Sequence, residues 1–71
     1  MMDTAAIDLL DFVRTFEFEI DVASQDIHPS AQAIIHEWIA EMFAEASAGS
    51  SSEVARLCTL VRDKIALERT F

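Results

Sequence analysis

Hydrophobic residues recur every three or four positions between residues 29 and 48, which is the spacing of one helix face. Pro29 suits the first turn of a helix and pushes the preceding His28 out of the helical conformation. Gly49, the only glycine in the chain, stands where a left-handed residue would end the helix. The apolar half of this helix consists of Ile34, Ile35, Trp38, Ile39, Met42, Phe43 and Ala46. The pattern therefore predicts a central helix over residues 29–48.

The rest of this helix surface is divided between small and acidic residues. Ala33, Ala40 and Ala44 cluster opposite the large apolar residues, where we expect them to let a second helix approach closely. An i, i+4 column of glutamates follows the edge of the apolar half: Glu37, Glu41 and Glu45. Like charges at this spacing cost a helix a few tenths of a kcal/mol per pair, a cost that a basic partner would offset.

The first 23 residues also carry a helical pattern, but with more apolar positions than one face can hold. One face holds Leu9, Phe12, Val13, Phe16, Ile20 and Ala23. Four further apolar residues fall on other faces of the same helix: Ile7, Leu10, Phe18 and Val22. A monomer has no use for apolar groups there, so this pattern predicts a helix near residues 4–23 with a second, partner-facing side.

Residues 16–22 also support a different interpretation. Their order, F-E-F-E-I-D-V, alternates strictly between apolar and acidic residues, as in a half-buried strand. A lone strand needs a partner strand, no second candidate is present, and acidic residues are poor strand formers. We favour a helix here, with an intermolecular strand as the alternative.

A third helix is predicted over residues 51–69. Ser50 and Glu53 fit the S-x-x-E capping box, which comes directly before an apolar run. The main stripe of this helix is Val54, Leu57, Cys58, Val61 and Ile65. The short connection makes the second and third helices an antiparallel hairpin. The expected fold is all-α, one three-helix domain over residues 1–71.

Size and composition together point to an additional interface. Of the 71 residues, 52% are hydrophobic, and a domain this small buries only about 60–65% of its unfolded surface. Three short helices cannot hide so many apolar groups in one monomer. The sequence therefore predicts a homodimer or an obligate partner.

The net charge of −8 is concentrated in the first two helices. Residues 1–50 hold ten acids against one base, Arg14, whereas residues 51–71 hold three acids against four bases. The net charge is thus −9 for residues 1–50 and +1 for residues 51–71. This distribution argues against direct binding to a nucleic-acid backbone or an anionic membrane. We expect the bases of the third helix to lie near the glutamate column.

No catalytic or metal-binding motif is complete. His36 and Glu37 begin like H-E-x-x-H, but Ala40 occupies the position of the second histidine. Cys58 lies in the apolar stripe of the third helix, where a buried thiol is inert. Trp38 is expected to pack in the core. We expect no enzyme activity, no metal and no cofactor.

The cellular setting is inferred from a few features. One cysteine excludes an internal disulfide framework and favours a reducing compartment. The first ten residues contain an acid where a signal peptide carries basic residues, and no apolar run is long enough to span a membrane. We expect a cytoplasmic protein that does not enter membranes.

These features together predict a small acidic protein-binding module that docks on a larger protein and inhibits or tethers it. Its size and acidity are similar to those of small helical inhibitors and adaptors of bacteria and phages, an analogy without a shared motif. The alternative is a nucleic-acid mimic that occupies the basic groove of a DNA- or RNA-binding protein. The expected partner-binding residues are Ile7, Leu10, Phe18, Val22, Glu37, Glu41 and Glu45, with Phe18 as the anchor.

Overall fold

Three helices make up the fold of this chain: α1 (Thr4–Ala23), α2 (Pro29–Ser47) and α3 (Ser51–Thr70). The computed structural model describes the backbone of residues 4–70 and the side chains of residues 8–69. The all-α prediction is confirmed, and the strand interpretation of residues 16–22 is wrong because this segment lies within α1. Between residues 4 and 70, no helix is long and apolar enough to cross a membrane.

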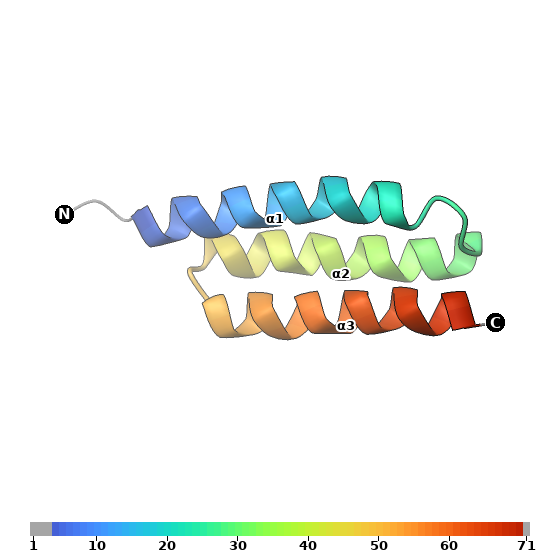
Figure 1. Cartoon of the computed structure of the whole chain (residues 1–71). Helices are drawn as coiled ribbons and strands as arrows, with labels where there is room; N and C mark the ends of the chain where they lie inside the picture. The colour runs from blue at the N-terminus through green and yellow to red at the C-terminus, as the bar shows by residue number, and fades with distance from the viewer. Residues whose placement is uncertain (1–3, 71) are drawn as a thin grey trace.

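Successive helices run in opposite directions, so α1 and α3 are parallel to each other and antiparallel to α2 (Figure 1). In Figure 1, α2 lies behind the other two, and it packs against both of them. The contact between α1 and α3 is much smaller than either contact with α2. The predicted hairpin of the second and third helices is therefore present, and α2 is the central helix.

Both ends of α2 are defined by local sequence. His28 is the N-cap in an extended conformation, and its Nδ1 accepts a hydrogen bond of 3.1 Å from the backbone N–H of Ser30. At the other end, Gly49 has a φ of +79°, in the left-handed region that favours glycine. The N–H of Gly49 donates to Ala46 and that of Ser50 to Glu45, the two bonds of a Schellman motif.

This C-terminal motif explains why the predicted capping box of α3 is absent. A capping box would need the Ser50 backbone N–H to donate to the Glu53 carboxylate. That N–H instead donates to the Glu45 carbonyl at 2.9 Å, because it completes the end of α2. The Glu53 carboxylate accepts hydrogen bonds from Arg56, one turn along α3.

The core lies where the three predicted apolar stripes meet. The buried hydrophobic residues are Val13, Phe16, Ile20, Ile27, Ala31, Ile35, Ile39, Met42, Ala46, Val54, Leu57, Cys58, Val61 and Ile65. The stripe predicted for the third helix is buried throughout, and Trp38 packs half-buried against this core. The expectation for the alanines is wrong: Ala33, Ala40 and Ala44 are exposed, because α1 and α3 both lie on the opposite side of α2.

Polar contacts tie the end of α1 to the other helices. The Gln32 side-chain amide donates to the backbone carbonyls of Ser24 and Ile27 in the connection between α1 and α2. The Arg69 guanidinium, on α3, donates to the Ala23 carbonyl at the last turn of α1. The Arg69 bond satisfies a carbonyl that the end of α1 leaves unpaired, and the three bonds together fix the position of α1 on the hairpin.

Candidate protein-interaction surface

The side of α1 that faces away from the other helices carries two large apolar side chains. Phe18 is 70% exposed and Val22 is 56% exposed. They are four residues apart and thus neighbours on one helix face. By contrast, Phe16 is only 2% exposed, on the core side of the same helix. The prediction that α1 has a second apolar side is therefore correct for Phe18 and Val22.

The two other apolar residues predicted for this surface have different outcomes. Leu10 is half-buried and packs against the core. It is therefore a weaker candidate for partner contact than Phe18. Ile7 lies outside the residues whose side chains the structure describes. The outward apolar pair is thus formed by Phe18 and Val22.

The predicted glutamate column lies on a different side of the molecule. The α1-facing edge of α2 is marked by His36, whose Nε2 lies 3.5 Å from an Asp21 carboxylate oxygen. Glu41 and Glu45 lie toward α3 instead, near enough to Arg56 for their charges to act on its guanidinium. The hydrogen bonds that the Arg56 guanidinium donates to the Glu53 carboxylate are the main cause that raises the pKa of Arg56, and the charges of Glu41 and Glu45 add to it.

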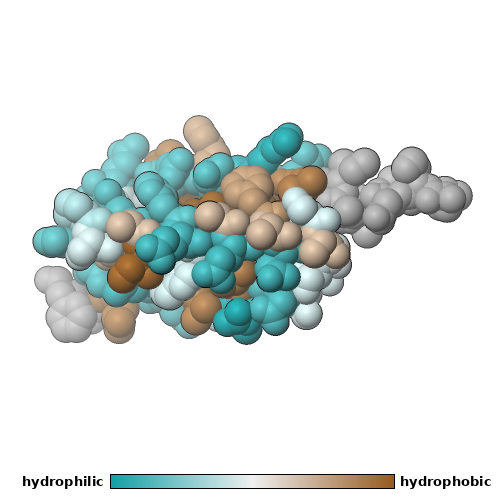
Figure 2. Space-filling model, turned by 180° about the vertical axis from the view of Figure 1, so that it is seen from behind, coloured by the Kyte–Doolittle hydropathy of each residue, from teal (hydrophilic) through white to brown (hydrophobic). Residues whose placement is uncertain are grey.

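The outward side of α1 and the glutamate column therefore do not form one continuous surface. Glu37 and Glu41 are exposed and Glu45 is half-buried. The expectation that bases of the third helix lie near the column is correct for Arg56, although Arg56 makes its ion pair with Glu53 at 2.8 Å. Seen from behind, hydrophobic and hydrophilic groups are interspersed over the molecule (Figure 2).

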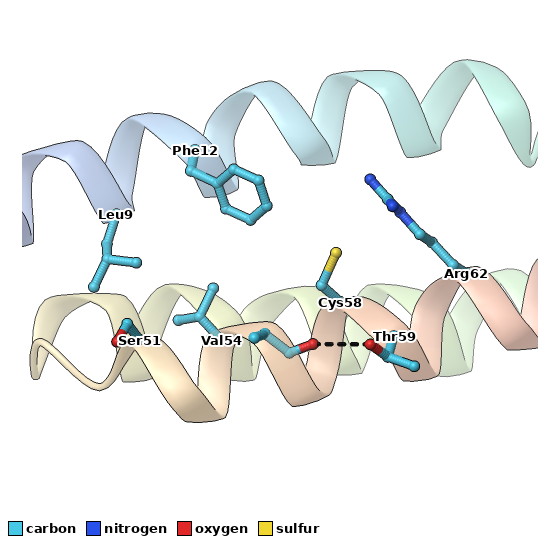
Figure 3. A pocket seen from close by; sticks show the side chains of 8 residues that line it. Leu9, Phe12, Ser51, Val54, Cys58, Thr59 and Arg62 are labelled. Atoms are coloured by element: carbon cyan, nitrogen blue, oxygen red, sulfur yellow. Dashed lines mark hydrogen bonds between the residues drawn. The ribbon is translucent and has the colours of Figure 1, made fainter.

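The prediction missed a groove between α1 and α3, which has a volume of about 500 Å³. Figure 3 shows Leu9 and Phe12 projecting from α1 toward α3, and Val54 and Cys58 projecting back from α3. Phe12 is 45% exposed there and stacks on the buried Phe16, with ring centroids 6.0 Å apart. The groove is lined by Leu9, Phe12, Ser51, Val54, Ala55, Cys58, Thr59 and Arg62.

One wall of the groove is made of small residues and ends at a basic one. Ser51, Ala55 and Thr59 follow one another at four-residue spacing along α3 and are exposed. The Arg62 guanidinium then lies 5.5 Å from the centroid of the Phe16 ring, a cation–π contact. The sequence pattern grouped Phe12 with the buried face of its helix and gave no sign that its side chain would be partly exposed beside a groove.

The described residues offer little chemistry beyond packing and charge. No three His, Cys, Asp or Glu side chains among residues 8–69 lie close enough together to hold a metal ion. Cys58 is buried on the floor of the groove. A smaller polar hollow beside the start of α2 is lined by Asp21, Ser24, Gln25, Gln32 and His36.

Comparison with known proteins identifies no relative of this chain. No protein-family model matches the chain, and neither a curated protein nor a solved structure shows significant similarity to it. Inference about function therefore depends on the residues themselves.

Proposed function

We propose that this chain is a protein-binding module, which docks on a larger protein through the outward side of α1 and inhibits or tethers that protein. The observation that carries the proposal is the exposure of Phe18 and Val22, 70% and 56%, one helical turn apart. Burying two such side chains in a partner provides a compact apolar anchor, the usual centre of a protein interface. It acts in the cytosol, where its single cysteine stays reduced.

The charges around this pair define the kind of partner that fits. Asp11, Glu19 and Asp21 are exposed on the same helix, and among residues 8–23 five acids stand against Arg14 alone. The matching surface is an apolar pocket with a basic rim. Carboxylates would speed and orient the encounter, and the apolar groups would hold the complex.

The protein is also a homodimer in this proposal. More than half of its residues are hydrophobic, and five large hydrophobic side chains among residues 8–69 remain exposed: Phe12, Phe18, Val22, Ile34 and Leu67. A second interface would remove part of this surface from water.

Affinity capture from the native cell tests the docking side directly. Three tagged chains are compared: the natural sequence, a Phe18→Ala/Val22→Ala double variant, and a Leu67→Ala control. Leu67 is 57% exposed on α3, so the control removes a similar apolar group from another helix. Loss of the captured protein in the double variant, with retention in the control, is expected. Equal capture by all three folded chains would refute the docking side.

A salt titration of the same capture separates docking from nucleic-acid mimicry. Apolar docking keeps the partner at high ionic strength, because burial of Phe18 does not depend on screening. Mimicry depends on carboxylates and would be lost when the Debye length falls from about 10 Å to about 3 Å. Capture that disappears at moderate salt would favour the mimic.

A further inference from the structure

We propose that the groove between α1 and α3 is closed by a second copy of this chain, with α1 of each copy lying along α3 of the other. This inference rests on the proposed homodimer, but it does not depend on the proposed docking side of α1. Four parallel helices, two from each copy, would then surround Leu9, Phe12 and the other groove residues.

The size of the face fits a small dimer. Helices α1 and α3 each have 20 residues, so each is about 30 Å long at a rise of about 1.5 Å per residue. Two helices side by side, spaced by about 10 Å, present a face of about 600 Å² per copy. The total of about 1,200 Å² is at the lower end of the range for stable interfaces.

Symmetry leaves two closed ways to stack this face on itself with the helices aligned. A two-fold axis along the helices places α1 on α3 of the other copy, running parallel. An axis across the helices places α1 on α1 and α3 on α3, running antiparallel. The first arrangement also fixes the register, because a shift along the axis would make an open screw rather than a closed dimer.

Charge favours the first arrangement. Among residues 8–23, α1 holds five acids against Arg14, a balance of −4, while residues 51–70 of α3 hold three acids against four bases, a balance of +1. Packing α1 on α1 would bring two strongly acidic helices together. Packing α1 on α3 avoids this repulsion and places acids near bases.

Side-chain size favours the same arrangement. Phe12 projects from α1 into the groove, and the exposed residues of the α3 wall are small: Ser51, Ala55 and Thr59. Because Phe12 and this wall lie at the same height in one copy, the unshifted dimer sets Phe12 against the small residues of the other copy. The antiparallel stack would instead set α1 against α1, so Phe12 would face the other copy's α1 rather than this wall of small residues.

One charge pair follows from this register. The Phe16–Arg62 contact places Arg62 level with Phe16, and Glu19 is the exposed residue three positions after Phe16. Glu19 of one copy therefore comes within about one helical turn of Arg62 of the other. In the antiparallel stack, Glu19 would face only the acidic α1.

Sedimentation equilibrium of the full chain tests the groove as the interface. Ala55→Glu places a larger, acidic side chain on the groove wall, and Ala40→Glu places the same side chain on the exposed back of α2. We expect Ala55→Glu to weaken dimerisation about tenfold or more and Ala40→Glu to change it less than about twofold. A natural chain that stays monomeric, or an Ala55→Glu dimer as tight as the control, would overturn the proposal.

Charge reversal tests the arrangement itself. Glu19→Arg should weaken the dimer, and adding Arg62→Glu to it should restore most of the loss. A tighter dimer from Glu19→Arg alone would indicate the antiparallel stack.

The Phe18→Ala variant separates this interface from the outward side of α1, and it should leave the dimer unchanged. If Phe18→Ala dissociates the dimer while Ala55→Glu does not, the interface is the outward side of α1. Partner capture by Phe18→Ala/Val22→Ala is measured separately, so failure of the docking proposal is distinguishable from failure of this one.

Discussion

The α2–α3 hairpin and helix α1 differ in how many of their side chains are buried in the fold or balanced in charge. The hairpin buries the whole predicted stripe of α3 and most of the apolar half predicted for α2, although Ile34 is exposed. Its turn is closed by a complete Schellman motif, and α3 has nearly balanced charge. Helix α1 buries one face but carries a strong excess of acids. It also holds three of the five large hydrophobic side chains that are exposed among residues 8–69.

This difference fits the division of labour that the proposed function requires of a very small domain. Residues that only support a fold should be buried, capped or paired, as most of them are in the hairpin, apart from the exposed Ile34 and Leu67. Exposed apolar groups with unbalanced charge do nothing for a monomer and are typical of surfaces that contact another protein. Stability is therefore expected to depend on the hairpin, and binding on α1.

The largest effect on stability is expected in the hairpin core. Leu57 is 1% exposed on α3, whereas Leu67 on the same helix is 57% exposed. Leu57→Ala should lower the free energy of unfolding by about 2–5 kcal/mol, because it leaves a cavity. Leu67→Ala is the matched control and should change it by less than about 0.5 kcal/mol. Urea denaturation measures both, and equal effects would contradict the assignment of the core.

The turn of the hairpin should contribute a smaller amount. A β-carbon at Gly49 would meet no other atom, so the cost of Gly49→Ala comes only from its φ of +79°. We expect a loss of about 1–2 kcal/mol in the free energy of unfolding. Gly49→Asn should cost less, because asparagine tolerates the left-handed region. If both variants have the same urea midpoint of unfolding as the natural chain, the Schellman motif is not important for stability.

The glutamate column should have the smallest effect. Glu37→Gln combined with Glu41→Gln removes like-charge repulsion along α2, so stability should rise by a few tenths of a kcal/mol. Glu41 also acts on Arg56, which reduces this gain. Partner affinity should not change, because the column faces away from the apolar side of α1. A clear loss of affinity for the partner would show that the glutamate column is part of the binding surface.

Local sequence signals predicted the helices well, because each acts within one turn of the chain. Pro29 and Gly49 marked the ends of α2, and the observed helix ends one residue before the prediction. The predicted capping box does not form, because the Ser50 N–H points at the Glu45 carbonyl and completes the end of α2 instead. Competition of this kind is decided only when both helices are in place.

The surface was less predictable, because it depends on how each helix is rotated relative to the others. Exposure of Phe18 and Val22 followed from their distance from the apolar stripe. The partial burial of Leu10, by contrast, depends on how α1 is rotated against the core. The separation of the glutamate column from α1, and the groove beside Phe12, likewise depend on the three-helix arrangement rather than on any single helix.

The most direct test compares two quantities in one variant, Phe18→Ala. Affinity for the captured partner, measured by calorimetry, should fall by about 1–3 kcal/mol if Phe18 is the anchor. The free energy of unfolding, measured on the same sample, should change by less than about 0.5 kcal/mol, because Phe18 is outside the core. Unchanged affinity, or a loss of stability like that of Leu57→Ala, would contradict the assignment of binding to the outward side of α1.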